Sequence, residues 1–346
     1  MFTQFCLMMR GPIPKAIFTI IFLIATLIIF SDFFPNRKRF VIAYISSSQT
    51  RKWRNDMEAV FEQNSDILPS RLNFMTANEL CNNTENCVIP NAKQEVRIRI
   101  APDFKIMNCL AQKSMSTVMA NIMCYLYNRT RYSDEVLNGN MSVWDKKKIC
   151  ENLNEYHDYQ TILKEYKSTR DEWQISMITR DPVERFISGY VDRCWRLYKG
   201  ENSCNGCHLN MTCFIISEYE KVLNESLEDT LGNKFEDRHF YPQNWKCHAP
   251  ALRKKYRFLR YSSDPSKSLM RDLTSLLIQQ NVSQNDIDYV KAELTTNRNT
   301  PHMTLDSPAR LFYENRLRTS PFLMEYVVKM FYHDFIIFNY SFPKGF

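Results

Sequence analysis

The stretch Ile178-Thr-Arg-Asp-Pro-Val-Glu-Arg-Phe-Ile-Ser-Gly-Tyr190 decides the fold, because it combines the end of a strand, a tight turn and the start of a helix. The apolar run from Trp173 to Ile178 predicts a buried strand that ends at Arg180. Pro182 is typical of the first turn of a helix. Apolar side chains then recur at helical spacing, at Val183, Phe186, Ile187 and Tyr190.

This strand, turn and helix predict a site for an anion. Arg180 ends the strand, and Ser188 falls in the second turn of the helix. A guanidinium and a hydroxyl near the positive end of a helix dipole are well suited to bind phosphate. We therefore expect Arg180 and Ser188 to bind a phosphate group, with Asp181 capping the helix that Pro182 begins.

A second strand, loop and helix come earlier in the chain. An apolar segment from Phe104 to Ala111 predicts a short strand, and apolar residues recur at helical spacing between Val118 and Tyr127. The loop between them carries a cation and three hydroxyls, those of Lys113, Ser114, Ser116 and Thr117. If Ser116 or Thr117 caps the helix, this loop is a second anion site; an ordinary turn with a solvated lysine is the alternative.

The composition excludes some nucleotide-binding classes and leaves others open. Only 7 of the 346 residues are glycine, and neither GxGxxG nor GxxxxGK[ST] occurs. The net charge of +7 and the pI near 8.7 favour an anionic partner, which includes nucleic acid. The cellular compartment therefore has to decide between these partners.

An apolar run near the N-terminus predicts a membrane anchor. Large residues crowd the end of this run, Ala16 to Phe30, and disfavour the alternative of a cleaved signal peptide. We expect residues 1–15 to be a cytoplasmic tail and 16–34 a transmembrane signal anchor. Residues 35–94 then form a stem and N-terminal lumenal region, and 95–346 the globular domain.

Cysteines and glycosylation sequons predict that the chain beyond the anchor lies in an oxidising lumen. Ten of the 11 cysteines follow the anchor, and so do the sequons at Asn82, Asn128, Asn140, Asn210, Asn224, Asn281 and Asn339. Four cysteines (194, 204, 207 and 213) cluster with His208, and in a lumen disulfides are favoured over a zinc site, with the pairing left open. A lumenal location argues against nucleic acid as the partner.

Both loops resemble those of the Golgi carbohydrate sulfotransferases, in the branch that includes chondroitin 4-O-sulfotransferases. The family pattern Arg-Asp-Pro-x-x-Arg-x-x-Ser-x-Tyr is complete from Arg180 to Tyr190. The first loop matches at Cys109, Lys113, Ser116 and Thr117. It departs at three positions where Pro, Gly and Trp are frequent, which hold Gln112, Met115 and Met119.

A third block extends the resemblance over roughly residues 95 to 342. The segment Asp237-Arg-His-Phe-Tyr-Pro-Gln-Asn-Trp-Lys-Cys247 is similar to the family's Asp-x-His-Trp-x-Pro-Gln-x-x-x-Cys, with Phe240 in place of Trp. The segment from Asp334 to Tyr340 is similar to the family's C-terminal block.

The resemblance implies a fold, a reaction and a location. The expected fold is a three-layer, P-loop-like α/β domain with a mainly parallel central sheet, plus one N-terminal transmembrane helix. The expected reaction is sulfuryl transfer from 3'-phosphoadenosine-5'-phosphosulfate (PAPS) to a glycan, in particular a chondroitin-like glycosaminoglycan, with no metal. The expected location is the Golgi membrane, as a single-pass type II protein.

The resemblance also implies roles for individual residues. Lys113 is the expected catalytic cation, placed at the bridging oxygen and the 5'-phosphate of the donor. The hydroxyls of Ser114, Ser116 and Thr117 are expected to hold the 5' side with it, and Arg180 and Ser188 the 3'-phosphate. His239 is the candidate base for the acceptor, oriented by Asp237 or merely structural. The alternative function is a catalytically inactive glycan- or nucleotide-binding protein of the same fold.

Overall fold

The chain, in a computed structural model, divides into two units, residues 1–52 and 53–346. The structure describes residues 57–70, 75–82, 84–91, 93–137, 141, 146, 149–197, 203–232, 235–262, 264, 266–296 and 307–346, all in the second unit. The anchor predicted at residues 16–34 lies outside these ranges. Within them, no helix has the length and apolarity needed to cross a membrane.

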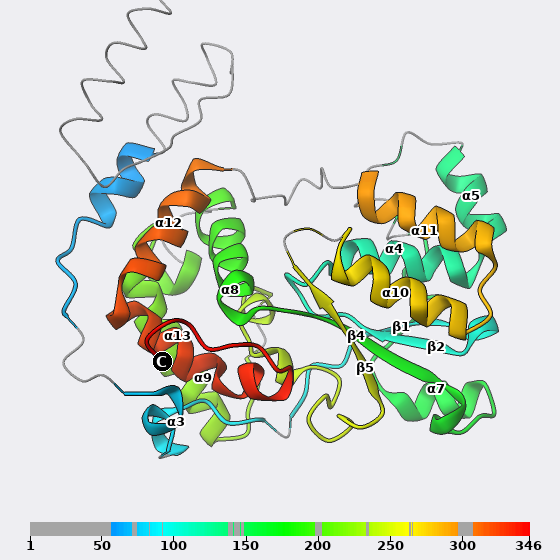
Figure 1. The fold of residues 1–346 in the computed structure, drawn as a ribbon, viewed down its shortest axis with the longest axis horizontal. Helices are drawn as coiled ribbons and strands as arrows, with labels where there is room; N and C mark the ends of the chain where they lie inside the picture. The colour runs from blue at the N-terminus through cyan, green and yellow to red at the C-terminus, as the bar shows by residue number, and fades with distance from the viewer. Residues whose placement is uncertain are drawn as a thin grey trace, which may run out of the picture. The chain divides into compact units, whose positions relative to one another are not determined.

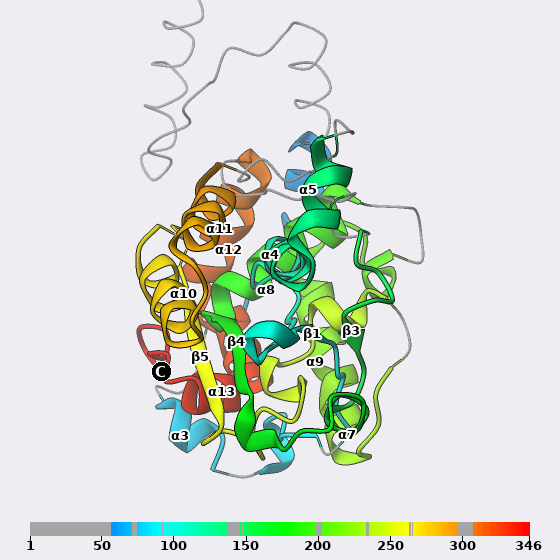
Figure 2. The same ribbon diagram turned by 90° about the vertical axis from the view of Figure 1, so that its right-hand side faces the viewer.

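A five-stranded mixed sheet with the order β3-β1-β2-β4-β5 lies at the centre of the second unit (Figures 1 and 2). Its strands are β1 (Ile98–Ala101), β2 (Ile106–Cys109), β3 (Glu155–Tyr156), β4 (Gln174–Arg180) and β5 (Tyr256–Tyr261). β2, β4 and β5 run parallel, whereas β1 pairs antiparallel with both β2 and β3.

The α/β class is therefore confirmed, but the expected mainly parallel sheet describes only β2, β4 and β5. β1 joins β2 through the single short turn Pro102–Phe104. So short a connection can join only antiparallel neighbours, because a parallel pair needs a crossover of a dozen or more residues.

Helices lie on both faces of the sheet (Figure 1). One face carries α4 (Ser116–Tyr127), α10 (Ser268–Gln279) and α11 (Gln284–Thr296), with α5 (Arg129–Leu137) beside α4, and the other carries α7 (Tyr159–Glu165). Successive side chains of β4 point to opposite faces. Ile178 accordingly packs in the cluster of α4 and α10, and Met177 packs in the cluster of α7.

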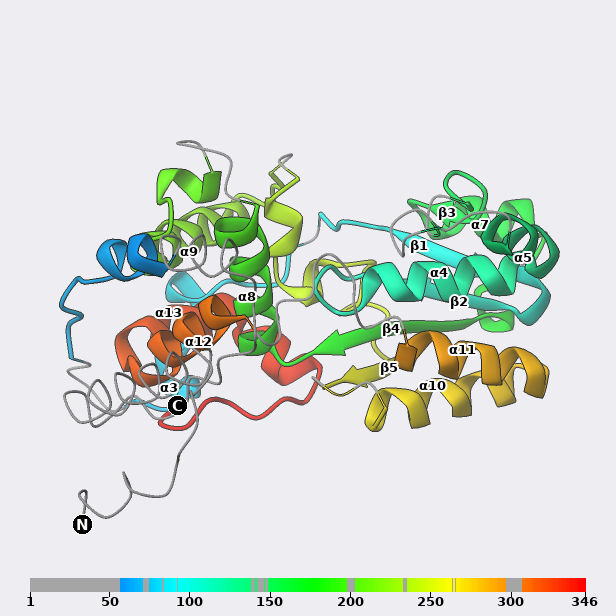
Figure 3. The same ribbon diagram turned by 90° about the horizontal axis from the view of Figure 1, so that it is seen from above.

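The remaining helices form a group beyond the end of the sheet toward which β4 runs (Figure 3). They include α3 (Ala77–Leu80), α8 (Pro182–Tyr190), α9 (Met211–Leu227), α12 (Pro308–Thr319) and α13 (Pro321–Ile337). Phe186 of α8 is fully buried among them, with ring contacts to Phe214 and Phe331. After Tyr190 the chain continues as a π-helical segment, Val191–Arg196.

Helix capping agrees with the sequence at one loop and not at the other. Asp181 caps α8 as predicted and accepts a hydrogen bond from the Glu184 amide at 3.0 Å. Capping of α4 by Ser116 or Thr117 is wrong, since the cap residue is Met115 and it makes no side-chain cap bond. Met115 is left-handed, with φ 56°, and this turn places both hydroxyl residues inside the first helical turn.

The ten cysteines of the second unit form five disulfides. The pairs are Cys81–Cys87, Cys109–Cys247, Cys124–Cys150, Cys194–Cys204 and Cys207–Cys213. The preference for disulfides over zinc in the cysteine cluster is thus confirmed. In the part of the chain that the structure describes, no group of three or more His, Cys, Asp or Glu side chains could hold a metal ion.

Candidate active site

The two predicted anion loops meet at one edge of the sheet. Because β2, β4 and β5 are parallel, the loops that follow them leave from the same edge, where ligands of α/β proteins usually bind. Nη1 of Arg180 donates a hydrogen bond to the carbonyl oxygen of Lys113 at 3.1 Å. The loop after β2 and the end of β4 are therefore in direct contact.

The first loop holds Lys113 against a carboxylate that sequence reasoning missed. The Lys113 ammonium pairs with Asp192, whose carboxylate also accepts a hydrogen bond from Nε of Arg196 at 2.9 Å. Burial lowers the pKa of Lys113 from 10.5 to about 8, against the opposing effect of Asp192. Ser116 and Thr117 are half-buried in the first turn of α4, where backbone N–H groups have no partner within the helix.

Arg180 is almost completely buried at the end of β4. Its guanidinium lies 5.1 Å from the centre of the Tyr261 ring and 3.6 Å from Oε2 of Glu184. Ser188 lies on α8, also nearly buried. The structure thus puts the cation of the second motif beside the first loop.

Arg185, the second arginine of the motif, forms a hydrogen bond to the backbone of the first loop. It is fully buried, and its Nε donates to the carbonyl oxygen of Gln112 at 3.0 Å. The side-chain amide Nε2 of Gln112 donates in turn to Oε1 of Glu95 at 3.1 Å. The glutamine that replaces the family's proline is therefore accommodated by polar contacts.

Gln243 of the third block connects both loops. Its Oε1 accepts from the Arg180 amide at 2.9 Å and from the Ser114 hydroxyl at 3.2 Å, and its Nε2 donates to the Arg180 carbonyl at 2.8 Å. The fully buried carboxylate of Asp334 on α13 accepts from the amides of Gln243 and Asn244 at 2.7 and 2.8 Å. One side chain therefore sets the positions of the two loops relative to each other.

His239 is buried and neutral. Burial, followed by the positive charges of Lys113 and Arg193, lowers its pKa from 6.5 to about 3. Its Nδ1 lies 3.0 Å from the carbonyl oxygen of Phe235, which can only accept, so Nδ1 carries the proton and Nε2 the lone pair. Asp237 pairs with Lys221 at 2.5 Å, so the carbonyl of Phe235 orients the imidazole in its place.

The third block packs directly on α8 at Gly189. A Cβ atom at this glycine would lie 3.0 Å from Cε1 of Phe240 and 3.3 Å from the carbonyl oxygen of His239. A side chain there would push the block away. The close approach of α8 and the third block therefore depends on the glycine at position 189.

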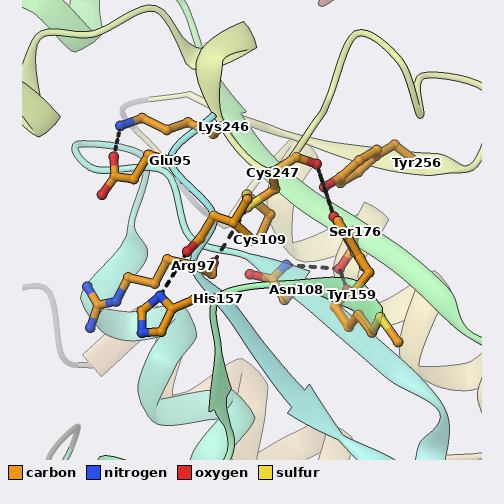
Figure 4. The surroundings of a disulfide bond; sticks show 12 residues. Glu95, Arg97, Asn108, Cys109, His157, Tyr159, Ser176, Lys246, Cys247 and Tyr256 are labelled. Atoms are coloured by element: carbon orange, nitrogen blue, oxygen red, sulfur yellow. Dashed lines mark hydrogen bonds and ion pairs between the residues drawn. A yellow bond between two sulfur atoms is a disulfide. The ribbon is translucent and has the colours of Figure 1, made fainter. Parts of the chain in front are cut away.

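The Cys109–Cys247 disulfide joins the end of β2 to the end of the third block (Figure 4). The carbonyl oxygen of Cys247 accepts from the hydroxyls of Tyr159 and Tyr256 at 3.1 and 2.9 Å. The first loop begins three residues after Cys109, at Gln112. The disulfide therefore fixes the start of the Lys113 loop next to the end of the segment that carries His239.

Two residues of this site had no role in the sequence prediction. Asp192 lies four positions after Ser188, a spacing that places both on one side of a helical run, and this signal could have identified it. Gln243 was matched within the third block, but nothing in its neighbourhood indicates that it bonds to Arg180. In contrast, Lys113, Ser114 and Arg180 are brought together as expected, with the Ser114 hydroxyl engaged by Gln243.

Comparison with known proteins decides the family. The model of the sulfotransferase family matches residues 96–341, well over half of the chain. The chain belongs to the sulfotransferase family. The resemblance inferred from the three sequence blocks is thereby confirmed at the level of the family.

Three curated relatives from Caenorhabditis elegans resemble this sulfotransferase. Uncharacterized protein C18B2.2 is 48% identical, over 91% of this chain and 87% of its own. "Putative sulfotransferase vep-2" is 37% identical, over 75% of this chain and 81% of its own. Carbohydrate sulfotransferase chst-1 is 27% identical, over 70% of this chain and 74% of its own. No solved structure matches.

Membership of the family supports an enzyme over an inactive binding protein and implies PAPS as the donor. The residues present fit such a ligand. Lys113 and Arg180 converge with the N-terminus of α4, and Nη1 and Nη2 of buried Arg185 make no hydrogen bond within the described part of the chain. Cations and free helix N–H groups are the donors that phosphate and sulfate require.

Proposed function

We propose that this sulfotransferase moves a sulfuryl group from PAPS to a hydroxyl of a glycan, specifically a chondroitin-like glycosaminoglycan. The observation that carries the proposal is the contact between the Lys113 loop and Arg180, which Gln243 fixes from the third block. It supplies two cationic positions on one sheet edge, as a nucleotide with phosphate groups at two positions would need.

On the donor side, each residue keeps the role expected from its motif. Arg180 and Ser188 bind the 3'-phosphate. Lys113, with Ser116, Thr117 and the N-terminus of α4, binds the 5' side. Ser114 contributes by positioning as well as by binding, because its hydroxyl already donates to Gln243. A charge-assisted contact of the Arg180 kind contributes on the order of 1.5–3 kcal/mol.

In the proposed reaction, Lys113 acts on the donor and His239 acts on the acceptor. The donor supplies an activated sulfuryl group on a phosphate oxygen. Lys113 stabilises the charge that develops on that oxygen, and this kind of electrostatic stabilisation is usually the largest contribution of an enzyme. To stabilise this charge, the Lys113 ammonium must either leave Asp192 for the donor anion or contact both of them at once.

On the acceptor side, His239 accepts the proton of the glycan hydroxyl through Nε2. Its tautomer suits this role, because Nδ1–H is held by the carbonyl of Phe235. A pKa near 3 makes the free imidazole a weak base. Anionic phosphates beside Lys113 would offset the positive charge that helps to lower this pKa, so donor binding would increase the basicity of His239.

The carbohydrate acceptor is supported by a relative and by charge. The relative chst-1 is named a carbohydrate sulfotransferase. The net charge of +7 favours an acidic glycan over a neutral one. These two observations together are the basis for the glycosaminoglycan acceptor.

We also propose that the protein is a single-pass type II protein of the Golgi membrane, with a glycosylated lumenal domain. Five disulfides support an oxidising compartment. Five sequon asparagines among the described residues are exposed, namely Asn82, Asn128, Asn224, Asn281 and Asn339. In animal cells, enzymatic removal of N-glycans should increase the gel mobility of the full-length chain, and an unchanged mobility would count against a lumenal domain.

Calorimetry with 3'-phosphoadenosine-5'-phosphate (PAP) on the folded full-length chain tests the donor assignment. A folded protein that does not bind PAP would overturn it. Transfer of radiolabelled sulfate from PAPS to a panel of glycosaminoglycans tests the reaction, and it should be lost in Lys113→Ala and His239→Ala. PAP binding should survive in His239→Ala, because this residue is assigned to the acceptor.

A further inference from the structure

Phe235 is an exposed aromatic residue that directly contacts the candidate base. It is 57% exposed, and it lies in the chain between α9 and the third block. Its carbonyl oxygen orients His239, and its ring lies 5.0 Å from the imidazole, centre to centre, at an interplanar angle of 64°. The backbone and the side chain of Phe235 therefore both contact the imidazole of His239.

A cation lies on the same ring. The guanidinium of Arg193, from the π-helical segment after α8, is 5.1 Å from the centre of the Phe235 ring. Its Nη2 is 3.6 Å from a carboxylate oxygen of Glu236, and its buried Nε makes no hydrogen bond within the described part of the chain. Arg193 also contributes to the low pKa of His239, which puts its charge close to the imidazole.

The other large apolar residues that are exposed in the described part of the chain lack this combination. Leu227 and Ile278 are similarly exposed, at 54% and 56%, and single exposed apolar residues are common on protein surfaces. Phe235 differs because it contacts both His239 and Arg193. An aromatic face beside a cation suits a ring that has one apolar face and an anionic substituent.

We propose that Phe235 and Arg193 form the subsite that binds an anionic sugar of the acceptor glycan. The C–H face of the sugar packs on the Phe235 ring, and its carboxylate or sulfate lies at Arg193. The hydroxyls of that sugar or its neighbour then lie at the imidazole of His239. This inference rests on the proposed function, since it describes the acceptor side of the same site.

Binding of unsulfated chondroitin and heparosan to the PAP-saturated full-length chain tests the subsite, because both are uronic-acid polymers. Phe235→Ala should weaken binding at least tenfold, whereas Phe235→Trp, which keeps an aromatic face, should retain it. Arg193→Gln should remove the preference for native over carboxyl-reduced polymer. Leu227→Ala is the matched control and should bind as the wild type does.

The outcomes separate this inference from the proposed function. Wild-type protein that binds PAP but neither polymer, or that binds the carboxyl-reduced polymers equally well, would overturn the subsite and leave the donor assignment intact. Unchanged polymer binding in Phe235→Ala would overturn it as well. Loss of PAP binding in the wild type would instead contradict the proposed function, while Phe235→Ala and Arg193→Gln should keep wild-type PAP affinity.

Discussion

The ammonium of Lys113 forms an ion pair with the carboxylate of Asp192, and this pair joins the loop after β2 to the helical run that carries Ser188. Both side chains are nearly buried. Breaking a buried pair by removing one partner leaves an unpaired charge, which is strongly destabilising. The lysine assigned to the donor is thus held in place, before any anion arrives, by a residue that follows the second motif on the same helical run.

The titration of Lys113 predicts a pH dependence of donor binding. Its pKa is lowered to about 8 in the free protein, and a bound phosphate would raise it again. Below pH 8 the ammonium is already present, and above pH 8 binding must first restore the proton. PAP affinity measured by calorimetry should therefore fall as pH rises above about 8, by up to tenfold per unit.

Two variants at this position serve as controls for that prediction. Lys113→Ala should bind PAP weakly at every pH between 7 and 9.5, and Lys113→Arg should lose the decline because an arginine keeps its charge. A decline that persists in Lys113→Ala would assign the titration to another group, such as Lys246, whose pKa burial also lowers to about 8.

Arg180→Ala should weaken PAP binding by roughly 10- to 150-fold, the equivalent of about 1.5–3 kcal/mol for a charge-assisted contact. The fold of this variant should persist for two reasons. Glu184 keeps Arg310 and Arg318 as partners, and the bonds of Gln243 to Arg180 go to the backbone and not to the side chain that is removed. Arg260→Ala on the neighbouring strand is the control and should bind PAP normally. If thermal unfolding shows that Arg180→Ala is unfolded, the arginine is structural.

Gln243→Leu should affect both stability and donor binding. It leaves the amide and carbonyl of Arg180 without their side-chain partner, at a cost of about 1–3 kcal/mol for each buried polar group. Urea denaturation should show a lower midpoint, and calorimetry a weaker PAP affinity. Gln284→Leu, at an exposed position, is the control and should change neither the urea midpoint nor the PAP affinity. If Gln243→Leu has the midpoint and the PAP affinity of the wild type, Gln243 has no role in the site.

Met115 offers a test of the first loop. Its φ of 56° costs a residue with a side chain about 1–2 kcal/mol, which glycine does not pay. Met115→Gly should therefore retain PAP binding, with little net change in the free energy of unfolding because glycine also makes the unfolded chain more flexible. Met115→Val should lower both, and equal behaviour of the two variants would show that this turn is unimportant for the donor.

Local patterns predicted the parts of the fold that depend on a few adjacent residues. The end of β4 at Arg180, the cap at Asp181 and the helix after Ser116 follow from apolar spacing and turn chemistry, and the structure has all three. The antiparallel β1 was not predicted as such, because pairing direction depends on the connection at Pro102–Phe104. The cap of α4 was wrong because Met115 adopts a conformation that its type rarely favours.

The site was predictable only as separate motifs. Lys113, Arg180 and His239 could be named because each lies in a recognisable block. Their connections could not, since Asp192 and Gln243 act through contacts between segments far apart in the chain. Such contacts have no periodicity and no fixed spacing, and they require the folded geometry.

The Cys109–Cys247 disulfide has a topological consequence for the enzyme. The two cysteines are 138 residues apart, and every residue assigned here to donor or acceptor, from Lys113 to His239, lies between them. The whole catalytic segment is thus a covalently closed ring. A protease that cuts the backbone once inside this ring leaves both fragments attached to each other, so a nicked enzyme can keep its substrate-binding halves until the disulfide is reduced.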